Sequence, residues 1–369
     1  MRRTKYMRSA VAVAAAMGAM LFAVATTSPG AHATTDSTPL AASAPLAASA
    51  PANSGIAAVV NPSADLAAQA PTSPDPLYVD SIYSISQLQG GGHKFALLVD
   101  VAALPNAGED EVLFSIADQT TGWYKNYEAP VPAGEFSWST TGLNLTAGGV
   151  TMTGGAQQIN ATATTPVGSF TGQYTPQGPA FNYSSVGLTQ LLSDTTYEYA
   201  FPDAITTGTL TAEGKTFTVS GTSWVDRQWG PQPLADPSMQ WTWFGMTLSN
   251  GDVVAVWDIL DGTAQNSWAT VLSPDGSYKV VSVTPVANGA TAPWTSPTSG
   301  NTYPTAWNIT IPSLSADLIV TKTGPTGQEL PNPDAHVEAT GSVLGTFNGS
   351  LVTGSTFLEQ NGNWTATGG

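Results

Sequence analysis

The sequence has no cysteine and few basic or histidine side chains, and each shortage removes a class of function. Without cysteine the chain has no disulfides, no thiolate metal sites and no cysteine nucleophile. Beyond residue 33 the only histidines are His93 and His336, too few for a histidine-rich metal centre. We therefore expect no bound metal.

The first 33 residues have the pattern of a secretory signal peptide. Basic residues are followed by an apolar stretch and then by Ala31-His32-Ala33, which has the small-x-small form of a cleavage site. An uncleaved membrane anchor is the alternative, because the apolar run at residues 10–26 is long for a signal core, although Gly18 interrupts it. We predict a signal peptide at residues 1–33 and a secreted, extracellular protein, free or wall-associated, without stable membrane insertion after cleavage.

Positive charge is the next shortage. Four of the ten Lys and Arg residues precede residue 33, which leaves six basic side chains against 26 acidic ones and a formal charge of −20. Such a surface repels phosphate groups, so nucleic acid and anionic membranes are poor candidate partners. Arg227 is the only arginine after residue 33.

The rest of the sequence divides by composition. Residues 34–74 consist mainly of Ala, Pro, Ser and Thr, with LAASAP twice, and are predicted to be a disordered spacer because they have few bulky groups to bury. The roughly 295 residues that follow are enough for two domains. The proline-rich segment at residues 230–238 is the candidate boundary, which gives domains at residues 75–232 and 233–369.

The periodicity after residue 74 is that of an all-β protein. Short runs rich in Val, Thr, Phe, Tyr and Trp, such as HKFALLVDVAAL and DVVAVWDILDG, alternate with Gly, Asn, Asp and Pro, and no amphipathic helix of any length is found. Turn sequences recur at hairpin spacing, among them Phe347-Asn348-Gly349-Ser350. We predict two β-barrel or β-sandwich domains.

Tryptophans concentrate around Arg227. Eight of the eleven fall at residues 224–307, although large flat side chains are costly unless they line a core, an interface or a pocket. Strand alternation places Trp224 and Asp226 on one face, and Arg227 and Trp229 on the other. Asp226 and Arg227 therefore need different partners.

Two interpretations of this segment are open. In the first, indoles pack a structural seam between two domains, with Asp226 and Arg227 bonded to the backbone or to distant charges. In the second, an apolar small-molecule pocket at the domain junction holds one buried acid and one guanidinium, with Trp241 and Trp243 on a shared strand face beyond the boundary. Burial among indoles would raise the pKa of Asp226 and keep a proton available for transfer.

Three segments in order resemble a known family: GTSWVDRQWG, WTWFGMTLSNGDVVAVWDILDG and SPTSGNTYPTAWNITIPS. They are similar to the two-domain lipocalin-like family of carotenoid 1,2-hydratase (hydroxyneurosporene synthase), kievitone hydratase, AttH-type proteins and certain Diels–Alder cyclases. The resemblance implies two consecutive lipocalin-like (calycin) domains with a ligand cavity near their junction. It also implies cofactor-free chemistry on a terpenoid, polyene or isoprenoid-like hydrophobic substrate.

Under this resemblance the sequence predicts a hydratase, another hydro-lyase or a cyclase. Hydration of an alkene needs a strong proton donor and shelter for a carbocation, and Asp226 is the predicted acid. Arg227 is the second candidate catalytic residue, as the holder of a second carboxylate or a substrate oxygen, or else it is an interdomain pin. The candidate substrate-binding residues supply polar groups and indole faces that stabilise a cation: Trp224, Trp229, Trp241, Trp243, Tyr303 and Glu338.

The sequence departs from the family at two places. Asp75-Pro76-Leu77-Tyr78-Val79 stands where the family has an aromatic Glu-Trp-Trp-Tyr start, and His336-Val337-Glu338-Ala339 stands where it has Tyr-Trp-Glu-Gly. Two aromatic residues of the family's pocket are thus absent, so the substrate is expected to differ from those of the family. Secretion also argues against a carotenoid, since carotenoids sit in cell membranes.

Two functions without this chemistry stay open. A secreted carrier of a hydrophobic ligand needs the same cavity and no acid, whereas a wall-associated glycan-binding protein needs its indoles on the outside. Glycoside hydrolysis would need two carboxyls at a set separation, and the sequence does not place Asp226 relative to Asp258. An enzyme requires Asp226 to face the cavity, which the sequence alone does not decide.

Overall fold

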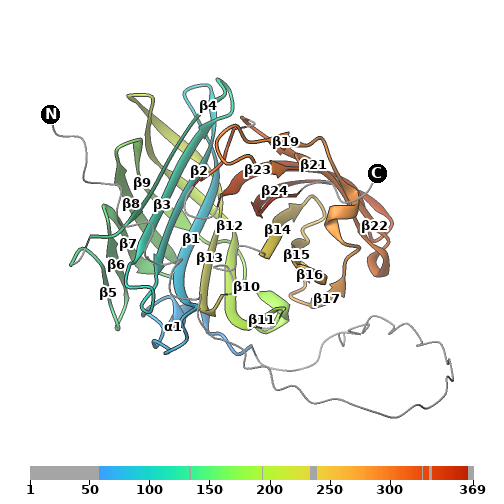
Figure 1. Cartoon of the computed structure of the whole chain (residues 1–369), viewed down its shortest axis with the longest axis horizontal. Helices are drawn as coiled ribbons and strands as arrows, with labels where there is room; N and C mark the ends of the chain where they lie inside the picture. The colour runs from blue at the N-terminus through green and yellow to red at the C-terminus, as the bar shows by residue number, and fades with distance from the viewer. Residues whose placement is uncertain are drawn as a thin grey trace, which may run out of the picture. The chain divides into compact units, whose positions relative to one another are not determined.

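The structure is a computed structural model that describes residues 58–132, 134–192, 194–232, 239–325, 327–331 and 335–364 (Figure 1). The predicted signal peptide at residues 1–33 and residues 34–57 of the predicted spacer lie outside the described residues. Most of the predicted boundary, residues 233–238, also lies outside them.

The described residues form two curled β-sheets, which confirms the predicted fold class of two consecutive all-β, lipocalin-like domains. Helix is limited there to α1 (Pro62–Asp65) and three short 3₁₀ segments, η1 (Tyr183–Ser185), η3 (Val286–Gly289) and η4 (Pro312–Leu314). Within the same ranges no helix is long and apolar enough to span a membrane.

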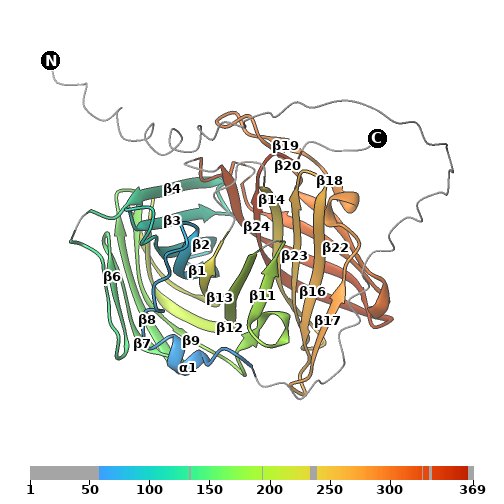
Figure 2. The same cartoon turned by 60° about the horizontal axis from the view of Figure 1, so that its bottom comes forward.

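The N-terminal sheet contains thirteen strands among the described residues: β1 (Tyr78–Gly90), β2 (His93–Ala103), β3 (Glu111–Asp118), β4 (Trp123–Pro130), β5 (Ser137–Trp138), β6 (Leu143–Ala147), β7 (Val150–Gly155), β8 (Gln158–Thr165), β9 (Gly168–Thr175), β10 (Phe181–Asn182), β11 (Leu188–Leu191), β12 (Asp194–Ala212) and β13 (Lys215–Pro231). Their order is β4, β3, β2, β1, β13, β12, β9, β8, β7, β6, β5, with β10 and β11 paired to β12. Figure 2 shows the curl of this sheet, in which β6 to β9 bend round toward β3 and β4. Its first and last strands in the sequence, β1 and β13, pair antiparallel.

The C-terminal sheet and a small hairpin use the remaining strands: β14 (Met239–Leu248), β15 (Val253–Asp261), β16 (Ala264–Leu272), β17 (Tyr278–Ser282), β18 (Ala290–Thr291), β19 (Trp294–Thr295), β20 (Thr302–Tyr303), β21 (Ala306–Ile311), β22 (Ala316–Thr323), β23 (His336–Phe347) and β24 (Ser350–Asn361). The order in the sheet is β17, β16, β15, β14, β24, β23, β22, β21, β18, while β19 pairs with β20 separately. The change from one sheet to the other falls between β13 and β14, in the proline-rich part of the sequence.

The turn at residues 348–349 shows why local sequence fixes a hairpin here. It joins β23 to β24 with two residues, and both have positive φ, 51° at Asn348 and 74° at Gly349. This is the geometry of a type I′ turn, whose twist matches that of the strands and which asparagine and glycine adopt at the least cost. The predicted turn is confirmed at this position.

The buried apolar side chains form three groups. One fills the N-terminal sheet and a second fills the C-terminal sheet. The third, here called the inter-sheet layer, takes residues from both sheets: Ile85, Leu98, Phe181, Tyr183, Leu191, Ala200, Trp224, Met239, Trp241, Trp243, Ala255, Trp257, Ile259, Trp268, Leu272, Leu330 and Phe357. Strand alternation produces this division, because successive side chains on β13 and β14 enter different groups.

The predicted disordered spacer is wrong for residues 58–74, which are ordered against the N-terminal sheet. α1 lies in this segment, at one end of the curled sheet (Figure 2). Leu66 is fully buried in the core of that sheet, and the Tyr199 hydroxyl donates a 3.0 Å hydrogen bond to the Pro62 carbonyl. A composition poor in bulky groups predicts disorder, but here one buried leucine and a few hydrogen bonds hold the segment.

Candidate active site in the inter-sheet layer

An acidic row crosses the N-terminal sheet on the face that meets the C-terminal sheet. Asp226 of β13 stands opposite Tyr83 of β1, which in turn stands opposite Asp100 of β2. On its other side Asp226 is opposite Ala200 of β12, and Glu198 lies two residues along β12 on the same face. Directly opposed residues on neighbouring strands point to one face, so these side chains lie side by side.

A second row crosses the C-terminal sheet and mixes indoles with acids. Trp243 of β14 is opposite Trp257 of β15, and Trp257 is opposite Trp268 of β16. On its other side Trp243 is opposite Glu359 of β24, and Glu359 is opposite Glu338 of β23. Three indoles and two carboxyls therefore occupy one continuous stripe of the sheet face.

The two rows are in direct contact. The Tyr83 hydroxyl donates a 2.6 Å hydrogen bond to Glu338 Oε2, and its ring meets Trp243 edge to face at 6.3 Å between centroids. Trp224 packs edge to face on Trp243 at 5.5 Å. Gly245 makes room for this packing, since a Cβ there would lie 2.8 Å from the Trp243 ring and 2.9 Å from the Trp224 ring. The sheets thus meet through aromatic side chains that surround the acids.

Asp226 is buried where the rows meet, with 8% of the residue exposed. It accepts a 2.9 Å hydrogen bond from Trp224 Nε1, and the Tyr183 hydroxyl lies 3.3 and 3.4 Å from its two oxygens as a donor. Burial raises the pKa of Asp226 well above its ordinary value; the two donors oppose that rise and nearby Glu359 adds to it. Burial and Glu359 thus favour the protonated form of Asp226, which is the form in which a general acid acts.

The other acids of the two rows also favour the protonated form. Burial raises the pKa values of Glu338, Glu198 and Asp100 well above their ordinary range, and neighbouring carboxyls raise each of them further. The charges that act on these three groups are all acidic, which disfavours ionisation of each. Within the described ranges, no three His, Cys, Asp or Glu side chains are arranged to hold a metal ion.

Glu359 differs from the other four carboxyls. Burial raises its pKa only to about 7, because the Trp241 indole N–H opposes the rise. Its charge raises the pKa of every other carboxyl in the two rows. Glu359 also keeps intermediate solvent exposure, as do Tyr83 and Asp100. At neutral pH it is about half ionised, so the layer combines one available base with acids whose pKa values are raised.

Several buried polar atoms in the layer lack a hydrogen bond of normal geometry within the protein. They include the indole N–H groups of Trp241, Trp243 and Trp257, although these residues are only 5%, 2% and 6% exposed. The Trp241 and Trp243 N–H groups nevertheless lie close enough to Glu359 and to the Tyr183 hydroxyl to act on the pKa of each. Asp100 Oδ1 and Glu198 Oε2 also lack donors. Unsatisfied buried groups cost free energy and are rare in folded proteins. Five such atoms lie in this layer beside the acids.

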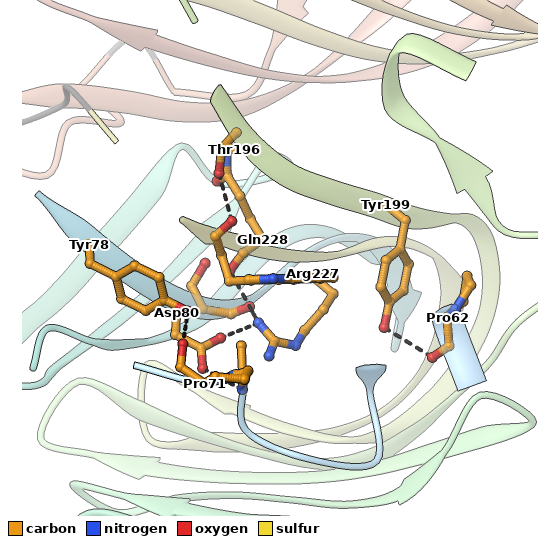
Figure 3. Close-up of polar contacts among 11 residues, drawn as sticks. Pro62, Pro71, Tyr78, Asp80, Thr196, Tyr199, Arg227 and Gln228 are labelled. Carbon is orange, nitrogen blue, oxygen red and sulfur yellow. Dashed lines mark hydrogen bonds and ion pairs between the residues drawn. The ribbon is translucent and has the colours of Figure 1, made fainter. Parts of the chain in front are cut away.

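Arg227 lies on the opposite face of β13 from Asp226, as strand alternation predicts. Its guanidinium forms an ion pair with Asp80, and both side chains are 1% exposed (Figure 3). Asp80 also accepts a 2.9 Å hydrogen bond from the Ala70 N–H, which ties the N-terminal segment to the ion pair. The prediction that Asp226 and Arg227 have different partners is confirmed.

Two indoles cover the guanidinium inside the N-terminal sheet. Its central carbon lies 4.7 Å from the centroid of the Trp138 ring and 4.9 Å from that of Trp229. These contacts belong to the N-terminal core, so Arg227 is not the pin between domains that was one of its expected roles. Trp229 likewise lies on this side and does not join Trp224 and Asp226. Arg227 and Trp229 occupy the alternate positions of β13 that face the N-terminal core, whereas Trp224 and Asp226 occupy those that face the inter-sheet layer.

The remaining candidates divide in a similar way. Glu338 lies in the second row, whereas Tyr303 is buried in the core of the C-terminal sheet. Asp258 points to the face of β15 opposite Trp257 and accepts a 2.6 Å hydrogen bond from the Ser267 hydroxyl, so it does not share the site of Asp226. The structure brings together five of the predicted residues: Asp226, Trp224, Trp241, Trp243 and Glu338.

The sequence analysis does not identify Glu359, the carboxyl whose charge acts on the other four acids. Glu359 lies in a run recognised as a strand, TFLEQ, and shares a strand face with Phe357. One feature of the sequence could identify Glu359, namely an acid that shares a strand face with apolar residues. Acidic side chains are rarely buried on such a face unless they have a specific role. The rest of the arrangement depends on register between strands far apart in the sequence, which local patterns do not contain. Tyr83, Asp100 and Glu198 are missed for that reason.

The fold and the site define a class of protein: two lipocalin-like β-domains with indoles and carboxyl groups of raised pKa between them. The sequence pattern of the AttH-like family matches residues 116–363. The chain therefore belongs to the AttH-like family, which confirms the resemblance seen in its motifs.

Three relatives show how far the similarity extends. The dehydratase asqC of Emericella nidulans is 28% identical over 151 residues, which span 37% of this chain and 41% of that protein. Kievitone hydratase from Nectria haematococca has a similar structure, with a TM-score of 0.66 at 22% identity over 77% of this chain and 89% of its own. An AttH protein from Nitrosomonas europaea has a TM-score of 0.67 at 18% identity, over 85% of this chain and 99% of its own. The structural similarities establish a shared fold.

Proposed function

We propose that this protein is a cofactor-free hydro-lyase that adds water to, or removes it from, an apolar small molecule in the inter-sheet layer. The carrying observation is that Glu359, with a pKa of about 7, lies close enough to Asp226 for its charge to raise further the pKa of that acid, which burial already raises well above its ordinary value. Addition of water needs both a base and an acid. The names of two relatives, kievitone hydratase and the dehydratase asqC, support the same class of reaction.

In the hydration direction, Asp226 gives its proton to one alkene carbon while the Glu359 carboxylate takes a proton from the water that attacks the other carbon. New C–H and C–O bonds form and the C=C bond becomes a single bond. Asp226 is then ionised and Glu359 protonated, and one proton returned from Glu359 to Asp226 restores the starting state. Dehydration follows the same steps in reverse.

The surroundings of Asp226 suit this chemistry. The indoles of Trp224 and Trp243 present aromatic surface to a developing carbocation, which is worth about 0.5–2 kcal/mol for each well-placed ring. Positioned proton transfer typically supplies about 10²–10⁴-fold in rate, so the acid and base are the larger contribution. A cyclase would use the same protonation, with an alkene of the same molecule in place of water.

The substrate class in this proposal is terpenoid, polyene or isoprenoid-like, and the place of action is outside the cell. Aromatic walls around the acids support an apolar substrate, and the signal-like pattern of residues 1–33 supports secretion. A non-enzymatic carrier would need the same layer without proton transfer. A glycan-binding role is less favoured, because Trp224, Trp241 and Trp243 are buried and do not form an exposed platform.

Native mass spectrometry of the full-length protein, mixed with an apolar extract of its own culture, tests the proposal. Wild type should convert a bound compound by the mass of one water, whereas Asp226→Asn and Glu359→Gln should hold it unchanged. Asp317→Asn is the matched control, because it removes an exposed carboxyl on β22. A compound that all four proteins hold without conversion would identify a carrier instead.

A further inference from the structure

Trp257 and Trp243 carry hydrogen-bond donors that the proposed reaction does not use. They are opposed on β15 and β14, with ring centroids 6.4 Å apart. Both are almost fully buried. The Trp257 N–H has no partner among the described residues, and the Trp243 N–H makes no hydrogen bond of normal geometry, although it lies near enough to the Tyr183 hydroxyl to act on its pKa. An indole nitrogen can only donate, so what completes these bonds must bring an acceptor atom.

The polar groups around these indoles add more donors. Asp226 and Glu338 each carry a carboxyl O–H when protonated, and the hydroxyls of Tyr83 and Tyr183 already donate to these two groups. The charges that act on Asp100, Glu198, Asp226 and Glu338 are acidic. The layer therefore has donors without well-formed hydrogen bonds, while at pH 8 the ionised Glu359 would repel a ligand anion.

Solvent exposure indicates the side from which a molecule reaches these donors. Tyr83, Asp100 and Leu113 form a line of opposed residues across β1, β2 and β3, and all three keep intermediate exposure. Glu359 on the facing sheet has intermediate exposure too, whereas Trp224 is fully buried. The layer is therefore more exposed to solvent on the β1 to β3 side than at Trp224.

We propose that the layer binds neutral molecules that carry a carbonyl or hydroxyl oxygen, and that the indole N–H groups of Trp257 and Trp243 hold this oxygen. The inference rests on the proposed function for the location of the substrate and narrows its class. A hydrocarbon forms no hydrogen bond with either N–H group, and a carboxylate or phosphate brings a negative charge that the ionised Glu359 repels. Neutral oxygenated molecules avoid both costs.

Four probes with the same fifteen-carbon skeleton test this selectivity: farnesene, farnesol, farnesal and farnesoic acid. We expect the full-length protein at pH 8 to bind farnesol and farnesal at least about tenfold more tightly than farnesene and farnesoic acid, since pairing a buried donor is worth that much. Protein labelled with ¹⁵N at tryptophan gives a second readout. The Nε1–H resonances of Trp257 and Trp243 should move with farnesol. That of Trp138, which is also unpartnered but lies in the N-terminal core, should not.

Single substitutions identify the donors. Trp257→Phe and Trp243→Phe keep an aromatic ring and remove the N–H, so each should bring the farnesol-to-farnesene affinity ratio close to one. Trp138→Phe removes an equivalent N–H outside the layer and should leave the ratio unchanged. If Trp257→Phe or Trp243→Phe unfolds, the shifts of the Nε1–H resonances in the wild-type protein still test the inference.

The inference is overturned by equal affinity for farnesol and farnesene, by tightest binding of farnesoic acid, or by no resonance shift with any probe. The last result would mean that the N–H groups hold only water. These outcomes are separate from failure of the proposed reaction, because binding is measured without turnover. A protein that selects farnesol but converts nothing would have the oxygen site and lack the hydro-lyase activity.

Discussion

Asp226 and Arg227 are neighbours on β13 and have opposite surroundings. Arg227 faces the N-terminal core, where Asp80 neutralises its charge and two indoles cover its planar faces. Asp226 faces the inter-sheet layer, where the nearest charges are other acids and its partners are an indole and a phenol. Both side chains are buried, yet only the charge of Arg227 is balanced.

The difference distinguishes a structural buried charge from a reactive one. An ion pair whose two members are fixed on one sheet has little freedom to exchange a proton. A set of buried acids with raised pKa values, next to one carboxyl with a pKa of about 7, is suited to exchanging protons. Unpaired indole donors on the same side add a place for a ligand. We therefore assign chemistry to the Asp226 face and stability to the Arg227 face.

The largest effect should come from Asp226→Asn, which keeps the shape of the side chain and removes its proton. We expect the rate of the hydro-lyase reaction to fall by about 10²–10⁴-fold, while the free energy of unfolding changes by no more than about 1 kcal/mol. Steady-state kinetics and urea denaturation measure the two quantities. A large loss of stability with unchanged activity would reverse the assignment of the two faces.

Arg227→Met should show the opposite pattern. It leaves Asp80 buried without its cation, so the free energy of unfolding should fall by about 3–5 kcal/mol. Activity per folded molecule should stay near that of wild type, because the guanidinium does not reach the inter-sheet layer. The double variant Asp80→Leu with Arg227→Met removes both charges and should recover much of the lost stability in urea denaturation. If the double variant is folded but inactive, Arg227 has a role beyond architecture.

Gly245→Ala tests the contact between the sheets. The added Cβ would overlap the Trp243 and Trp224 rings, and overpacking of this kind costs about 1–3 kcal/mol. Because the clash falls inside the layer, binding of farnesol should weaken as well. Gly155→Ala on β7 is the control, since a Cβ there meets nothing within 4 Å. Equal effects of the two variants on binding would show that the layer is not the binding site.

The comparison also shows what sequence reasoning reached and where it stopped. Strand alternation placed Asp226 and Arg227 on different faces, and the motifs identified the family. The partners of each residue depend on pairings such as β1 with β13 and β14 with β24, whose members lie more than a hundred residues apart. Local patterns contain no register, so Asp80 and Glu359 could not be assigned. The ordered segment at residues 58–74 was missed because its few contacts are also tertiary.

The last prediction is a pH dependence that separates stability from activity. Glu359 has a folded pKa of about 7 against an ordinary value of 4.5, so between these pH values the folded state holds a proton that the unfolded state has released. Its contribution to stability is therefore complete below about pH 4.5 and is lost as pH rises through 7, on the order of 3 kcal/mol in total. Activity should rise over the same interval, because the reaction needs Glu359 ionised. Urea midpoints and rates measured from pH 5 to 8 should move in opposite directions in wild type, and Glu359→Gln should abolish this stability slope. If stability and activity rose together with pH, the group with a pKa near 7 would stabilise the fold when ionised. That result would contradict the assignment of this pKa to Glu359, because ionisation of a carboxyl among other acids costs stability.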